Sequence, residues 1–190
     1  MKEFTKSIMA GMAIALGCCL FLLAPNNLIG AVLFSCGLLC VRIYGLNLFT
    51  GKVQYIPTDK YPLRYYFIVL LGNLLGVIAI WGMTCGLTHE AAIQVAEAKA
   101  SQDFLIALMK GLGCGMLMSL ATYKESPLWM CLLCVPAFIL AGFNHCIADA
   151  YYALAGGKIG FGFLGTIIGN ISGGAVLLSK YILGNDKSNI

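Results

Sequence analysis

The sequence contains few charged residues. Asp, Glu, Lys and Arg make up 11% of its 190 residues, while 60% are hydrophobic. Soluble domains carry about 25% charged residues, and no core in water could hide so much apolar surface. The composition therefore excludes a soluble enzyme and a disordered chain. The mean hydropathy of +0.88 indicates a chain whose solvent is a lipid bilayer.

Other scarcities exclude further classes of protein. The net charge is only +4 and is scattered along the chain, so nucleic-acid binding is not expected. The nine cysteines lie in apolar stretches, where cysteine behaves as a small hydrophobe rather than a disulfide partner. Cys131 and Cys134 form one C-x-x-C pair with no second pair nearby, so neither a metal nor another cofactor is expected.

Six apolar segments predict an all-α membrane protein that forms one transmembrane domain over residues 1–190. A spanning helix needs about 20 residues. The segment before Pro25 lacks a small-x-small cleavage site, which favours a first spanning helix over a signal peptide. The expected helices cover about residues 7–24, 27–56, 64–87, 104–123, 127–155 and 161–184.

The second and fifth segments are too long for one span, and each contains a polar break, near 45–51 and 142–149. They are the middle helices of two halves with three helices each. Because each half crosses the membrane an odd number of times, the two halves have opposite orientations in the membrane. Paired broken helices in inverted repeats place irregular backbone at mid-membrane depth, where it lines a cavity. The residues themselves show no strong repeat.

The basic residues predict the orientation. Six spans put both termini and the loops after the second and fourth spans on one side, with eight Lys and Arg against two on the other. This bias favours cytoplasmic termini in a multi-pass protein of the inner (cytoplasmic) membrane. The larger group is Lys2, Lys6, Lys52, Lys60, Arg64, Lys124, Lys180 and Lys187, and the smaller is Lys99 and Lys158.

The two breaks hold the residues that could carry chemistry. The first reads YGLNLFTG at 44–51, where two glycines bracket Asn47 and Thr50; a merely kinked helix is the alternative. The second reads AGFNHCIAD at 141–149. An intramembrane His or Asp is costly and marks a pathway by default, although His145 could also be a core histidine. A neutral imidazole can still donate a hydrogen bond to an anion.

These blocks, with LLGNLLG at 70–76 and GNISGG at 169–174, occur in the order and spacing of a known family. The chain resembles the formate/nitrite transporter family, the pentameric channels for small monovalent anions. The resemblance implies an aquaporin-like architecture, although the chain has no Asn-Pro-Ala motif.

The resemblance also implies roles for single residues. His145 matches the central pore histidine, Thr50 the threonine that faces it, and Lys99 the lysine of the outer vestibule. Asn144 and Asn170 match pore-lining positions beside that histidine and on the sixth helix. The implied cytoplasmic constriction is Leu38 and Leu48 with Phe49, and the outer one is Phe34 and Phe138.

The chain departs from the family pattern at several points. Only six residues precede the first expected span, so the usual N-terminal amphipathic helix is expected to be missing. Position 144 is Asn where many members have Glu, and position 149 is Asp where others have Asn. Arg42 could pair with Asp149 or Asp103, or add positive potential to the pore.

The expected function is a channel or proton-coupled transporter for formate, nitrite or hydrosulfide. Lys99 would concentrate the anion, and the apolar rings would strip its water and raise the pKa of the bound weak acid. The acid would then cross in neutral form past His145. The expected partners are this anion, a proton, membrane lipid and four more copies of the chain. The alternatives are a haem- or quinone-binding redox subunit and a non-conducting homologue.

Overall fold

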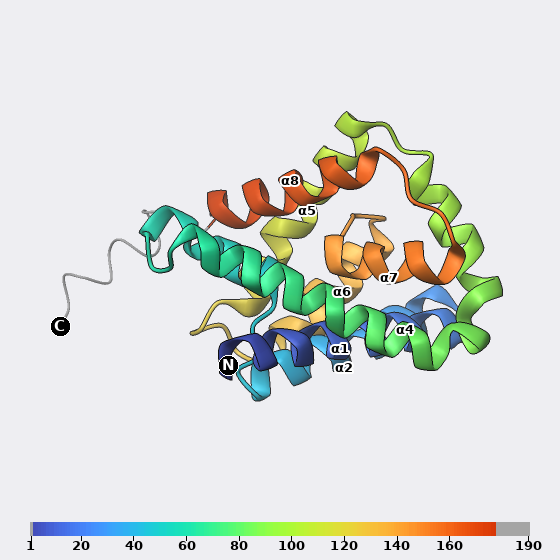
Figure 1. Ribbon diagram of the computed structural model, residues 1–190, viewed down its shortest axis with the longest axis horizontal. Helices are drawn as coiled ribbons and strands as arrows, with labels where there is room; N and C mark the ends of the chain where they lie inside the picture. The colour runs from blue at the N-terminus through green and yellow to red at the C-terminus, as the bar shows by residue number, and fades with distance from the viewer. Residues whose placement is uncertain (1, 178–190) are drawn as a thin grey trace.

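The computed structural model describes residues 2–177, and these form an all-helical bundle with no β-strand (Figure 1). The expected continuation of the last span to 184, together with Lys180 and Lys187, lies outside the described residues. The elements are α1 (Lys2–Leu23), α2 (Asn27–Ile43), α3 (Phe49–Lys52), η1 (Val53–Thr58), α4 (Leu63–Ala100), α5 (Phe104–Thr122), α6 (Met130–Leu140), α7 (Cys146–Gly156) and α8 (Gly162–Leu177).

Three helices, α1, α4 and α5, are each long and apolar enough to cross a bilayer. The 22 residues of α1 extend about 33 Å, which matches the roughly 30 Å hydrocarbon layer. Large apolar side chains also cover the outside of the bundle; Leu71 is 55% exposed and Met83 77%. An apolar exterior suits contact with lipid or with neighbouring subunits.

Two helices are interrupted in the stretches where the sequence predicts breaks. The chain leaves α2 at Ile43 and resumes helical geometry at Phe49, and it leaves α6 at Leu140 and resumes at Cys146. The first break contains Gly45 with a φ of +58°, and the second contains Gly142 with a φ of +69°. Glycine adopts this left-handed conformation without the steric cost that a Cβ atom imposes.

The third span is longer than the sequence predicts. Helix α4 does not end near Leu87 but continues to Ala100, so the polar stretch that begins at Thr88 is helix rather than loop. Its residues EAAIQVAEAKA at 90–100 are mostly strong helix formers and include no Gly or Pro. Figure 1 shows α4 running along the molecule and then bending sharply, so that its last turns approach α7 and α8. The Lys99 side chain, near the end of α4, donates to Asn144.

The helices pack mainly as two pairs, α1 with α4 and α5 with α8. Small residues allow each pair to approach closely. A Cβ atom on Gly76 would lie 2.1 Å from the Ile8 carbonyl oxygen, and one on Gly173 would lie 2.1 Å from that of Leu112. These glycines therefore serve close helix contact.

Candidate functional site

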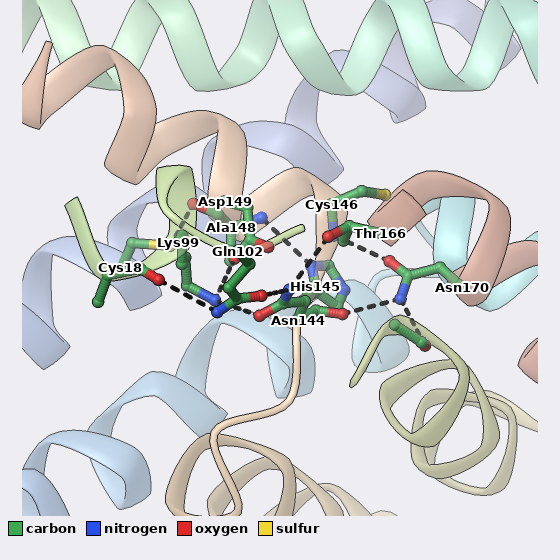
Figure 2. Close-up of polar contacts among 12 residues, drawn as sticks. Cys18, Lys99, Gln102, Asn144, His145, Cys146, Ala148, Asp149, Thr166 and Asn170 are labelled. Carbon is green, nitrogen blue, oxygen red and sulfur yellow. Dashed lines mark hydrogen bonds and ion pairs between the residues drawn. The ribbon is translucent and has the colours of Figure 1, made fainter. Parts of the chain in front are cut away.

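Asn170 of α8 holds the second break in place. Its Oδ1 accepts the Cys146 amide at 2.8 Å, and its Nδ2 donates to the carbonyls of Asn144 and Gly111, each at 2.8 Å (Figure 2). One buried amide thus satisfies backbone groups on both sides of His145. Backbone that leaves the helix inside the bundle has no water to satisfy it, so this side chain completes its hydrogen bonding.

Asn73 of α4 does the same for the first break. Its Oδ1 accepts the Phe49 amide at 2.8 Å, and its Nδ2 donates to the carbonyls of Asn47 at 2.8 Å and Ser7 at 2.7 Å. Both asparagine side chains are fully buried. The two breaks therefore share one hydrogen-bonding design.

The correspondence between the breaks extends to the sequence. Asn47 and Asn144, Phe49 and Cys146, and Asn73 and Asn170 are three pairs, and each pair is 97 residues apart. The signal in the sequence is short: G-x-N at 45–47 and 142–144, and G-N-x-x-G at 72–76 and 169–173. Sequence reasoning missed this repeat, because few residues outside these motifs are the same in both halves.

His145 makes two hydrogen bonds at the start of α7. Its Nδ1 accepts the Ala148 amide at 3.2 Å, and its Nε2 lies 2.8 Å from the Thr50 hydroxyl of α3. A neutral imidazole carries one proton, on one of its two nitrogens. Because Nδ1 accepts a hydrogen bond, the proton lies on Nε2, and Nε2–H donates to Thr50. The structure thus brings together the two polar residues that the sequence predicts to face each other, and both are buried.

Aromatic rings lie beside the histidine. Phe138 of α6 stacks on His145 with ring centroids 5.8 Å apart, and Phe34 of α2 meets the edge of Phe138 at 5.9 Å. The expected constriction residues Leu38, Leu48 and Phe49 are all buried. Phe138 therefore gives His145 an apolar neighbour, with Phe34 packed behind it.

Lys99 reaches the second break from the end of α4. Its ammonium lies 2.8 Å from the Asp149 carboxylate and donates to the side-chain oxygen of Asn144 at 2.9 Å. The Asn144 amide nitrogen in turn donates to Gln102 at 2.6 Å and Thr166 at 3.2 Å. Figure 2 shows this network lying against the His145 loop.

A cavity of about 580 Å³, here called the His145 cavity, opens onto one side of the histidine. Phe138 and Gln102 are in its wall. Its charged lining consists of Lys99, Lys110 and Asp149. Sequence reasoning singled out the first and last of these, whereas Lys110 was not among the candidate site residues.

A second cavity of about 310 Å³, here called the Lys52 cavity, is lined by Leu48 and Gly51 of the first break. No Asp or Glu of the described residues lines it. Tyr55 and Tyr61 also face it, and the Lys60 ammonium lies 4.5 Å from the Tyr55 ring centroid. Its cations are Arg42, Lys52, Lys60 and Lys124.

Neither of the two ion pairs suggested for Arg42 is present within residues 2–177. The guanidinium donates instead to backbone carbonyls at and after the end of α5, those of Ala121 at 2.8 Å, Ser126 at 2.5 Å and Tyr123. The end of a helix leaves carbonyls without partners, and a planar guanidinium with five donors can bind several of them at once. Arg42 therefore joins α2 to the α5–α6 connection.

Comparison with known proteins agrees with this architecture. A Bacillus subtilis (strain 168) protein described as Uncharacterized transporter YrhG is 29% identical over 187 residues, covering 80% of this chain and 69% of that protein. Formate channel FocA of Escherichia coli (strain K12) is 24% identical over 184 residues, covering 80% and 65%. The chain thus spans about two thirds of the length of these relatives.

Solved structures show the same fold. A structure described as "FNT family ion channel" superposes with a TM-score of 0.80 at 21% identity and covers 100% of this chain and 90% of its own. A structure described as "Pentameric formate channel with formate bound" gives 0.74 at 24% identity, covering 91% and 92%. Residues 1–183 match the family described as Formate/nitrite transporter, and the chain therefore belongs to that family of membrane transporters.

Proposed function

We propose that the chain is a channel or proton-coupled transporter for small monovalent anions of weak acids, such as formate, nitrite or hydrosulfide. The observation that carries the proposal is the His145–Thr50 hydrogen bond of 2.8 Å, which joins the two helix breaks. His145 lines one cavity, and Leu48, two residues before Thr50, lines the other. A path between the cavities would pass this polar pair.

The chemistry of the site supports passage as a neutral acid. A bare anion in a low-dielectric region costs many kcal/mol, so its charge is neutralised or paired instead. Phe34 and Phe138 form the proposed constriction on one side of His145, and Leu38 and Leu48 with Phe49 form it on the other. The imidazole N–H, released from Thr50, would donate to the acid between them.

The assembly and topology belong to the same proposal. The hydrogen bonds that recur 97 residues apart support two inverted three-helix repeats, of aquaporin-like architecture, in residues 2–177. The eight-to-two distribution of basic residues supports cytoplasmic termini in the inner membrane. The similarity to a pentameric formate channel supports a homopentamer, with one pore in each protomer.

Flux measurements test the proposal. The purified chain in proteoliposomes should take up formate, nitrite or hydrosulfide faster than protein-free liposomes, and faster at pH 5.5 than at pH 7.5 because more protons are available for co-transport. Sulfate, a dianion of a strong acid, is the matched control and should stay outside. If none of the three monovalent anions enters above the protein-free rate at either pH, the proposal is wrong and a non-conducting homologue is favoured.

A further inference from the structure

Lys99, the cation that the family resemblance assigns to the outer vestibule, already forms an ion pair. Lys99 lies 2.8 Å from the Asp149 carboxylate and donates to Asn144 at 2.9 Å. Asp149 is 5% exposed, so water screens this pair weakly. Together the two residues add no net charge to the His145 cavity. An arriving anion would have to compete with a resident carboxylate for Lys99.

Lys110 supplies the positive charge that remains. It lines the same cavity as His145 and Asp149, and within residues 2–177 it is the third of the three charged residues there. Within residues 2–177 its ammonium makes no ion pair and no side-chain hydrogen bond. The charged groups that the structure describes in this lining therefore sum to one positive charge, and Lys110 is the cation among them without an ion pair.

The position of Lys110 points to a role in the cavity. It lies in the second turn of the spanning helix α5 and is half-buried. Its backbone carbonyl accepts the Asn144 amide at 3.3 Å, which fixes this turn of α5 against the residue before His145. An unpaired lysine in a spanning helix is costly unless it faces a water-filled cavity, and such residues mark the paths of ions.

We propose that Lys110, rather than the ion-paired Lys99, is the cation that binds a small monovalent anion in the His145 cavity. The inference rests on the proposed function for the identity of the anion. The Lys99–Asp149 pair then serves as a positioning element: Lys99 holds the Asn144 side chain and Asp149 holds Lys99. The anion reaches the mouth of the pore at Lys110 and moves from there to His145.

Equilibrium binding tests this without any need for flux. The probe is ¹³C-formate, whose NMR signal broadens when it exchanges with sites on the detergent-solubilised full chain. Loss of one close charge in a watery cavity is expected to weaken binding about threefold to tenfold. Lys110→Gln should therefore reduce the broadening by this factor at low salt, and the difference should shrink in about 0.5 M salt.

Two variants separate this effect from a folding defect. Lys110→Arg keeps the charge and should restore most of the broadening. Lys158→Gln removes a cation from the exposed ion pair with Glu97 and should leave the broadening unchanged. Equal broadening in wild type and Lys110→Gln overturns the inference, whatever the flux assays give. Loss of broadening in Lys110→Gln without any wild-type flux instead supports the binding site and contradicts transport.

Discussion

At the scale of single residues, His145 caps a helix and also lies in the proposed pore. Its Nδ1 caps α7 through the Ala148 amide, so only Nε2 faces Thr50. A ring protonated on both nitrogens has no lone pair left for that amide. Protonation of this side chain in the proposed pore would therefore remove a hydrogen bond from the first turn of α7.

Replacement of His145 should separate these two roles. In His145→Asn the side-chain oxygen can still cap α7, while the titratable ring is lost. We expect the faster formate uptake at pH 5.5 to disappear and the total rate to fall at least about tenfold, equivalent to about 1.4 kcal/mol, with the oligomer unchanged on gel filtration. His145→Ala should lose uptake and also some stability.

A matched pair at Thr50 gives the control for this experiment. Thr50→Ser keeps the hydroxyl that meets Nε2 and should retain uptake, whereas Thr50→Val removes it at nearly constant volume and should not. An unaltered pH profile in His145→Asn would remove the histidine from the proposed mechanism.

At the scale of elements, the two breaks depend on one asparagine each. Asn170→Asp keeps the acceptor for the Cys146 amide but loses both Nδ2 hydrogen bonds. Buried carbonyls left without partners cost about 1–3 kcal/mol each, and the new buried charge adds to the cost. We expect a clear drop in the thermal unfolding temperature in detergent, measured by circular dichroism.

The equivalent change in the other half provides the comparison. Asn73→Asp removes the bonds to Asn47 and Ser7 and should destabilise by a similar amount. An unfolding temperature equal to that of the wild type in either variant would show that the asparagine does not hold its break.

Much of this framework was predictable from residue patterns. Glycines and polar residues inside apolar segments indicated both breaks, and the histidine within the second break indicated the site. The length of α4 was missed because the polar residues after Thr88 were taken to end the apolar span, although the alanine-rich stretch at 90–100, with no Gly or Pro, favours a helix. The partners of Arg42 were also hidden, since backbone carbonyls carry no signal in a sequence. The ion pair of Lys99 with Asp149 depended on the direction in which the end of α4 runs, which no local sequence pattern indicates.

At the scale of the whole molecule, the exposed apolar surface has to be covered by lipid or by other copies of the chain. Native mass spectrometry from mild detergent should give an assembly of about five times the 20.3 kDa chain. The apolar outer faces of the helices provide the contact area, so the assembly should persist in high salt. A monomer or a dimer as the main species would contradict the pentamer.

The two equivalent breaks contain positions whose side chains hold the backbone and positions whose side chains differ between the halves. Asn73 and Asn170 bind only backbone groups of the two equivalent breaks, and the side chains at corresponding positions differ: Leu48 corresponds to His145 and Lys52 to Asp149. Selectivity can therefore change over evolution without a redesign of the scaffold. A protein engineer could likewise alter which ion passes by exchanging residues at these positions and leaving both asparagines untouched.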